Sequence, residues 1–126
     1  SKDYAVSLCR VPEYGVTTAP VTINQTDIVA AQIAVADALF ANGEFVKAAL
    51  RYRGIFKETD NPDILVGEVI SILKSGDLDA GFERDELLQD RLGEVTDTGL
   101  LDQYEKAMEQ AVEAYMAMPE SSKKSS

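Results

Sequence analysis

The chain has 126 residues, of which 45% are hydrophobic, and it carries a formal net charge of −10 at pH 7 with a sequence pI near 4.3. This length suits one domain with its own core, and the negative charge argues against nucleic acid or an anionic membrane as a partner, because both would repel it. The sequence has no histidine and a single cysteine, Cys9. These counts exclude zinc sites of the usual kind, serine–histidine and cysteine–histidine mechanisms, and an internal disulfide.

Residues 1–25 differ in kind from the rest of the chain. Residues 4–11 and 15–23 are rich in β-branched and other apolar residues, and Pro12 and Pro20 interrupt them. This pattern predicts a small β-hairpin or an extended arm. A two-stranded hairpin is marginally stable alone, so we expect the arm to pack on its own helical domain or on another subunit.

Residues 28–56 are predicted to form the helical hairpin on which the other segments pack. Asn24 and Asp27 suit the start of a helix, and Gly43 ends it. Apolar residues cover most of the circumference of this first helix, which predicts burial on several sides. A second helix restarts at Glu44, and its narrower apolar stripe consists of Phe45, Ala48, Ala49, Tyr52, Ile55 and Phe56.

The order L-x3-G-E-F-x2-A-x3-Y over residues 39–52 resembles a tetratricopeptide (TPR) helix pair. In this pattern Gly43 closes the turn, Ala48 lets the two helices approach closely, and Phe45 and Tyr52 fill the surrounding space. Gln32 departs from the family pattern, since a large apolar residue is usual there. An unrelated helical hairpin with a glycine turn is the alternative interpretation.

An eroded second copy of the unit is indicated over residues 63–95. A shift close to the ~34-residue TPR period aligns Phe40–Ala48 with Leu73–Gly81, and the match ends beyond Gly81. The resemblance implies a partner groove on exposed positions of the first helix of each pair. The positions that it assigns to partner binding are Ile33, Asp37, Phe40, Val66, Ile70 and Lys74.

Three further helices are predicted after residue 60. One begins at Asn61 and Pro62, a favourable cap and first residue, and ends at Ser75–Asp77. The others cover Glu83–Val95 and Leu100–Met118, and Pro119 ends the last. The predicted fold is therefore all-α, a four- to five-helix antiparallel bundle or a short TPR-like stack, with an arm over 1–25, a helical domain over 26–119 and a flexible tail over 120–126.

Charge is distributed unevenly along the chain. Between Lys57 and Glu105 there are 14 acidic and 4 basic residues, whereas the first 56 residues are close to neutral. Such asymmetry suits head-to-tail contacts between copies, and a solvated acidic face is the simpler account. Residues 77–86 are acidic but lack EF-hand spacing, and the scattered glycines form no phosphate-binding pattern, so no cofactor is expected.

These observations favour a non-catalytic protein-interaction module, a small adaptor or chaperone that binds an apolar or amphipathic partner segment. The alternatives are a structural subunit of a virus or phage particle or a scaffold, and an acidic inhibitor that mimics DNA. The expected partner is another protein or further copies of the chain. No apolar run approaches the ~18 residues that span a bilayer, and we expect a cytoplasmic protein, or a virion-associated one under the structural alternative.

Overall fold

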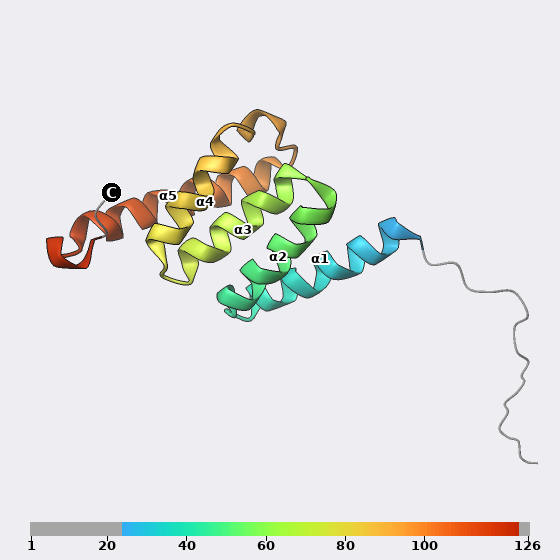
Figure 1. Ribbon diagram of the computed structural model, residues 1–126, viewed down its shortest axis with the longest axis horizontal. Helices are drawn as coiled ribbons and strands as arrows, with labels where there is room; N and C mark the ends of the chain where they lie inside the picture. Colours follow the sequence, from blue (N-terminus) through green and yellow to red (C-terminus); the bar gives the residue numbers. More distant parts are fainter. Residues whose placement is uncertain (1–23, 124–126) are drawn as a thin grey trace, which may run out of the picture.

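The computed structural model describes residues 24–123, so the predicted arm lies almost entirely outside the described residues (Figure 1). Within this range the chain forms α-helices and short 3-10 helices and has no strand, which confirms the all-α prediction. The α-helices are α1 (Gln25–Ala41), α2 (Phe45–Thr59), α3 (Pro62–Lys74), α4 (Leu78–Gln89) and α5 (Thr98–Ala117). Two 3-10 helices, η2 (Leu92–Glu94) and η3 (Glu120–Ser122), follow α4 and α5.

Local sequence signals set the ends of the first three helices. The Asn24 side chain accepts a hydrogen bond from the Thr26 amide at 2.9 Å and caps α1. Gly43 takes a φ of +80° in the turn between α1 and α2, a conformation that glycine adopts without steric cost. Asn61 accepts a hydrogen bond from the Asp63 amide at 3.0 Å and caps α3, with Pro62 in its first turn as predicted.

Helix α3 is the centre of the molecule. Figure 1 shows it between α2 and α4, and α5 packs on it as well, whereas α1 packs on α2. Ten of its 13 residues are buried, and they form one run from Ile64 to Leu73. The main core is therefore assembled around α3, with Tyr52, Phe56, Leu88 and Tyr104 supplied by its neighbours.

The prediction that α1 is buried on several sides, with the other segments packed on it, is wrong. Only Ala36 of this helix is buried, and Val35 is 46% exposed. Figure 1 shows that the N-terminal half of α1 projects beyond the other helices. Since α1 has its main contact with one neighbour, α2, most of its circumference faces solvent.

Helices α4 and α5 begin earlier than predicted. Asp77 accepts a hydrogen bond from the Ala80 amide at 3.2 Å, so α4 starts at Leu78 instead of Glu83. Gly81, which a sequence pattern treats as a weak helix residue, is buried in α4, and a Cβ atom at this position would overlap the Leu73 side chain. The predicted end of this helix is replaced by η2, which ends before Val95, and α5 begins at Thr98 instead of Leu100.

A buried carboxylate joins the three central helices. Glu68 of α3 is fully buried, and its Oε2 atom lies 2.7 Å from Arg53 Nε of α2 and 3.0 Å from Arg84 Nε of α4. The two guanidinium groups offset part of the cost of removing this charge from water. Within residues 24–123, no helix is long and apolar enough to cross a membrane.

Candidate partner-binding groove

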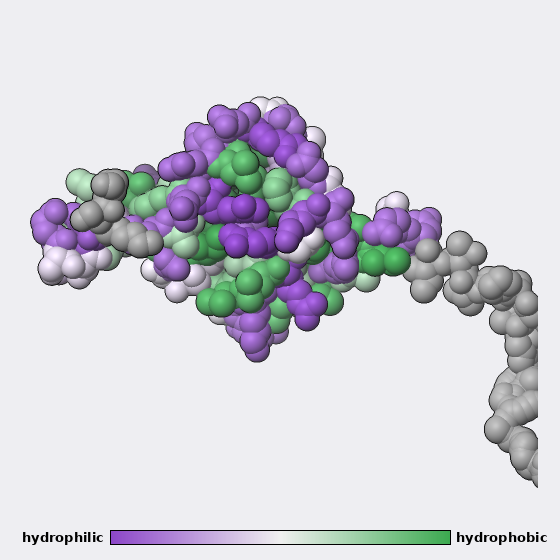
Figure 2. All heavy atoms as spheres, viewed as in Figure 1, coloured by the Kyte–Doolittle hydropathy of each residue, from purple (hydrophilic) through white to green (hydrophobic). Residues whose placement is uncertain are grey.

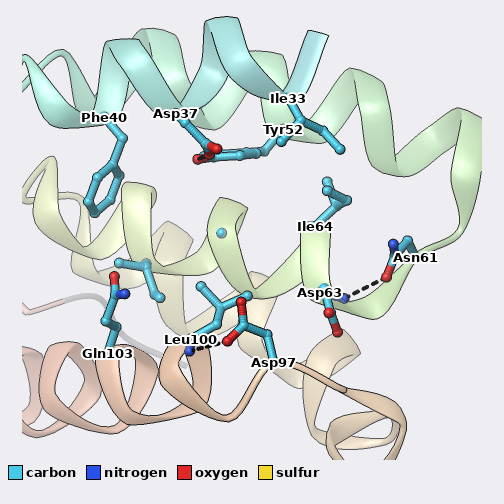
Figure 3. Close-up of a pocket in the computed structure, with 12 residues that line it drawn as sticks. Ile33, Asp37, Phe40, Tyr52, Asn61, Asp63, Ile64, Asp97, Leu100 and Gln103 are labelled. Atoms are coloured by element: carbon cyan, nitrogen blue, oxygen red, sulfur yellow. Dashed lines mark hydrogen bonds between the residues drawn. The ribbon is translucent and has the colours of Figure 1, made fainter. Parts of the chain in front are cut away.

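A groove with a volume of about 470 Å³ lies between α1 and α5, over α3 (Figure 3). Its walls come from helices that are far apart in sequence, and α3 forms much of its floor. The residues that line it are Ile33, Asp37, Phe40, Tyr52, Asn61, Asp63, Ile64, Gly67, Ile70, Asp97, Leu100 and Gln103.

The α1 wall is formed by three side chains at helical spacing. Ile33, Asp37 and Phe40 extend from α1 into the groove, as Figure 3 shows. The Asp37 carboxylate accepts a short hydrogen bond from the Tyr52 hydroxyl of α2. Burial, and then this hydrogen bond to Asp37, raise the pKa of Tyr52, so the phenol stays protonated and holds α1 against α2.

The floor depends on a close approach of α2 and α3. A Cβ atom at Gly67 would meet the Tyr52 ring at 3.3 Å, which is tighter than ordinary van der Waals contact. The glycine therefore lets the Tyr52 ring lie against α3. Ile64 and Ile70 stand about one turn to either side of Gly67, so the floor is apolar with a tyrosine ring across it, and these three side chains are themselves largely buried.

The opposite wall is fixed by hydrogen bonds at the start of α5. Asp97 Oδ1 accepts a hydrogen bond from the Leu100 amide at 3.1 Å and caps this helix. Asp63 of α3 accepts hydrogen bonds from the amide and the hydroxyl of Thr96 at 2.9 and 2.8 Å. These bonds tie the loop before α5 to α3 and position Leu100 and Gln103 opposite α1 (Figure 3).

The groove is negatively charged. Three carboxylates, those of Asp37, Asp63 and Asp97, are among its 12 lining residues, and none of the 12 is lysine or arginine. The hydrogen bonds that these carboxylates accept come from neutral hydroxyl and amide groups. No lysine or arginine between residues 24 and 123 forms an ion pair with them, so their charge is available to a ligand.

The structure brings four of the six predicted partner-binding residues into this groove and leaves two outside it. Ile33, Asp37, Phe40 and Ile70 line it, although Ile70 is only 1% exposed. Val66 is fully buried in the core and has no surface to offer a partner. Lys74 lies outside the groove, with its Nζ atom 5.9 Å from the centre of the Phe45 ring.

Sequence reasoning missed the residues that α5 and the interhelix loops contribute. Asp97 caps α5, Leu100 and Gln103 lie on it, and the sequence assigned none of them to the groove; it assigned Asn61 only the role of a helix cap. The order of the helices could have indicated the role of α5. In a stack of helix pairs, the first, third and fifth helices lie on the same side, so α5 shares a side with α1 and α3. Tyr52 was recognised as a packing residue, and its hydroxyl contact with Asp37 was not.

No protein-family model, no curated protein and no solved structure matches this chain. Within the described range, no cluster of three or more histidine, cysteine, aspartate or glutamate side chains is arranged to hold a metal ion. The groove is therefore the feature of the described residues that points to a function.

Proposed function

We propose that the protein is a non-catalytic binding module whose groove between α1 and α5 binds a partner segment that presents apolar side chains beside a lysine or arginine. One observation carries this proposal: a groove of about 470 Å³ combines apolar side chains with three carboxylates and has no basic lining residue. The size suits a few side chains of a peptide.

The apolar part of the groove supplies the contact area. Phe40 and Ile33 stand on the α1 wall, Leu100 stands on the α5 wall, and all three are partly exposed. Burying these side chains under a partner contributes roughly 25 cal/mol for each Å² removed from water. An aliphatic or aromatic residue of the partner between the two walls uses both of them.

The carboxylates supply specificity. A cationic side chain in the groove gains attraction from three acids, whereas an acidic one is repelled. The affinity of such a ligand falls as the salt concentration rises, because part of the attraction is screened. A neutral apolar ligand shows little of this salt dependence.

The helix arrangement supports a TPR-like interpretation of the module. Helices α1 and α2 form one pair, α3 and α4 form the next, and α5 packs on α3, which is the order of two pairs followed by a closing helix. The groove lies on the side of the odd-numbered helices, which is the side that the TPR resemblance implies for a partner.

A random peptide library displayed on phage and selected against the full chain tests the proposal. We expect the enriched peptides to combine apolar residues with lysine or arginine, and Phe40→Asp to abolish their binding. Val35→Asp is the matched control, because Val35 is an exposed residue of the same helix and does not line the groove. Equal binding by Phe40→Asp and Val35→Asp would exclude the groove as the binding site.

A charge substitution tests the electrostatic part separately. Gln103→Lys adds a positive charge to the groove and disturbs no hydrogen bond made by the described residues, and it is expected to weaken basic peptides about two- to five-fold. Gln110→Lys adds the same charge to an exposed position of α5 outside the groove and is expected to change little. Equal losses from both variants would show that only the net charge matters.

A further inference from the structure

A second surface lies on α2, away from the groove. Val46 and Leu50 are 62% and 64% exposed, which is unusual for large apolar side chains on a helix that is otherwise well packed. Arg53 and Lys57 continue the same line along the helix at exposed positions. The spacing of 4, 3 and 4 residues places all four on one stripe, in the order apolar, apolar, basic, basic. We call this the α2 stripe.

A second stripe lies on α5. Glu105, Glu109, Val112 and Met116 are all exposed, and Met116 is the most exposed large apolar residue of residues 24–123, at 71%. The spacing is again 4, 3 and 4, and the order is acidic, acidic, apolar, apolar. We call this the α5 stripe, and Figure 1 shows that the C-terminal half of α5 projects beyond the other helices.

The two stripes are complementary when the helices run in opposite directions. Reversing α5 places Met116 beside Val46 and Val112 beside Leu50, and the acidic pair then meets the basic pair, Glu109 with Arg53 and Glu105 with Lys57. Because both spacings are symmetric, all four positions stay in register over about 17 Å of helix. Parallel helices would place the apolar residues opposite charges.

A groove with a largely apolar surface lies beside the α2 stripe. A groove of about 290 Å³ runs between α2, α3 and α4, and Val46, Ala49, Leu50 and Ile72 are among its lining residues. Figure 2 shows hydrophobic and hydrophilic patches side by side over the part of the molecule where α2 and α4 lie. A long flexible side chain such as that of Met116 fits a groove of this kind.

We propose that the α2 stripe of one copy packs antiparallel against the α5 stripe of a second copy. Each stripe faces solvent while the opposite side of its helix packs on α3, so the two cannot meet within one molecule. Since the contact joins two different surfaces, it leaves one stripe free on each copy. Such a head-to-tail contact builds a ring if the rotation closes and an open chain if it does not.

The pairing also agrees with the charge distribution of the described residues. Helix α2 carries Lys47, Arg51, Arg53 and Lys57 against one acid, Glu58, in a molecule that is otherwise strongly acidic. Arg53 is held partly by Glu68, whereas Lys57, Glu105 and Glu109 form no ion pair within residues 24–123. Basic and acidic stripes on separate helices attract between copies and disfavour pairing of like surfaces.

Two variants of the full chain, each with one stripe disabled, test the proposal. Val46→Asp with Leu50→Asp disables the α2 stripe, and Val112→Asp with Met116→Asp disables the α5 stripe. We expect the unaltered chain to gain mass in sedimentation velocity as its concentration rises toward about 1 mM, since a small contact binds weakly. We expect each variant to stay monomeric, and an equimolar mixture of the two to form a 1:1 complex, because each variant retains the stripe that the other lacks.

Several outcomes would overturn the proposal. An unaltered chain that remains monomeric throughout this range excludes the contact. A folded variant that still self-associates points to pairing of like surfaces, and a mixture that stays monomeric shows that the two stripes do not bind each other. Circular dichroism checks folding, and Ile28→Asp with Val35→Asp on α1 is the control, since it changes two exposed apolar residues outside both stripes and is expected to leave self-association intact.

A charge exchange tests which residues of the two stripes face each other. Lys57→Glu places two acids opposite each other and is expected to weaken self-association about two- to five-fold, and Glu105→Lys alone is expected to do the same by placing two bases together. Both substitutions in one chain are expected to restore the attraction, because an acid again faces a base and the two charges have only exchanged places. Additive losses in the double variant would show that these residues do not meet, and would reject the antiparallel register.

Discussion

Helices α1 and α3 have similar apolar sequences and opposite environments. Apolar residues surround most of each helix in the sequence, yet α3 is buried at ten of 13 positions and α1 at one of 17. Bulky apolar residues are denser in α3, where Ile, Leu and Val occupy seven of 13 positions, whereas alanine fills many of the exposed positions of α1. The position of each helix in the stack also sets how many of its residues are buried, since α3 packs mainly against three helices and α1 against one.

The comparison teaches that all-round apolarity does not identify the central helix. A helix rich in alanine exposes little apolar area per residue, so it can stand at the edge of the fold at a small cost. A helix rich in leucine, isoleucine and valine has to be enclosed. The exposed side of α1 also leaves the groove open, because nothing among residues 24–123 covers Ile33 and Phe40 fully.

The largest expected effect comes from removing side-chain volume from α3. Leu65 is fully buried, so Leu65→Ala should lower the free energy of unfolding by about 2–5 kcal/mol through lost burial and a cavity. Val35→Ala, the equivalent truncation on α1, should change it by less than about 0.5 kcal/mol. Denaturant unfolding measures both, and similar losses would show that α1 is as enclosed as α3.

An intermediate effect is expected from a pair of glycine substitutions. Gly67→Ala on α3 places a Cβ atom 3.3 Å from the Tyr52 ring and should destabilise the protein by about 1 kcal/mol or more, because the hydrogen bond to Asp37 restrains that ring. Gly54→Ala on α2 meets no atom within 4 Å and should stabilise it by about 0.5–1 kcal/mol. Changes of the same sign in thermal unfolding would contradict the close approach of α2 and α3.

The smallest effect concerns the tyrosine that links α1 to α3. Tyr52→Phe removes the hydrogen bond to Asp37 and should cost about 0.5 kcal/mol at neutral pH, because the exposed Asp37 carboxylate can bond water instead. Since burial and Asp37 raise the pKa of Tyr52 in the folded state, its contribution is complete below the unfolded-state pKa of about 10 and is lost as the pH rises further. The stability of the unaltered chain should therefore fall more steeply above pH 10 than that of Tyr52→Phe.

Tyr104 of α5 offers a second instance of the same effect at the contact with α4. Burial, and then its hydrogen bond to Asp85 at 2.5 Å, raise the pKa of Tyr104. Tyr104→Phe should reduce the same alkaline loss by a comparable amount. Parallel stability curves for the unaltered chain and both variants between pH 9 and 11, a window centred on about the unfolded tyrosine pKa, would show that neither phenol is held by its carboxylate.

The sequence by itself determined the helices and most of their ends. The caps at Asn24 and Asn61, the turn at Gly43 and the stop at Pro119 are local signals, and they act through hydrogen bonds and dihedral angles within a few residues. Helix α4 was misplaced because Gly81 argues against a helix locally, whereas its contact with Leu73 is a property of the packed structure. The three groove residues of α1, Ile33, Asp37 and Phe40, were among the positions that the TPR resemblance implied.

Only the tertiary structure decided which helix is central and which residues share the groove. The sequence did not indicate that Val66 would face the core while Leu100 and Gln103 would face α1, because these placements depend on how α5 returns to α3. The same holds for Glu68, whose burial between two arginines depends on three helices meeting. Periodicity fixes which residues share a face of one helix, and the packing of the other helices fixes what that face contacts.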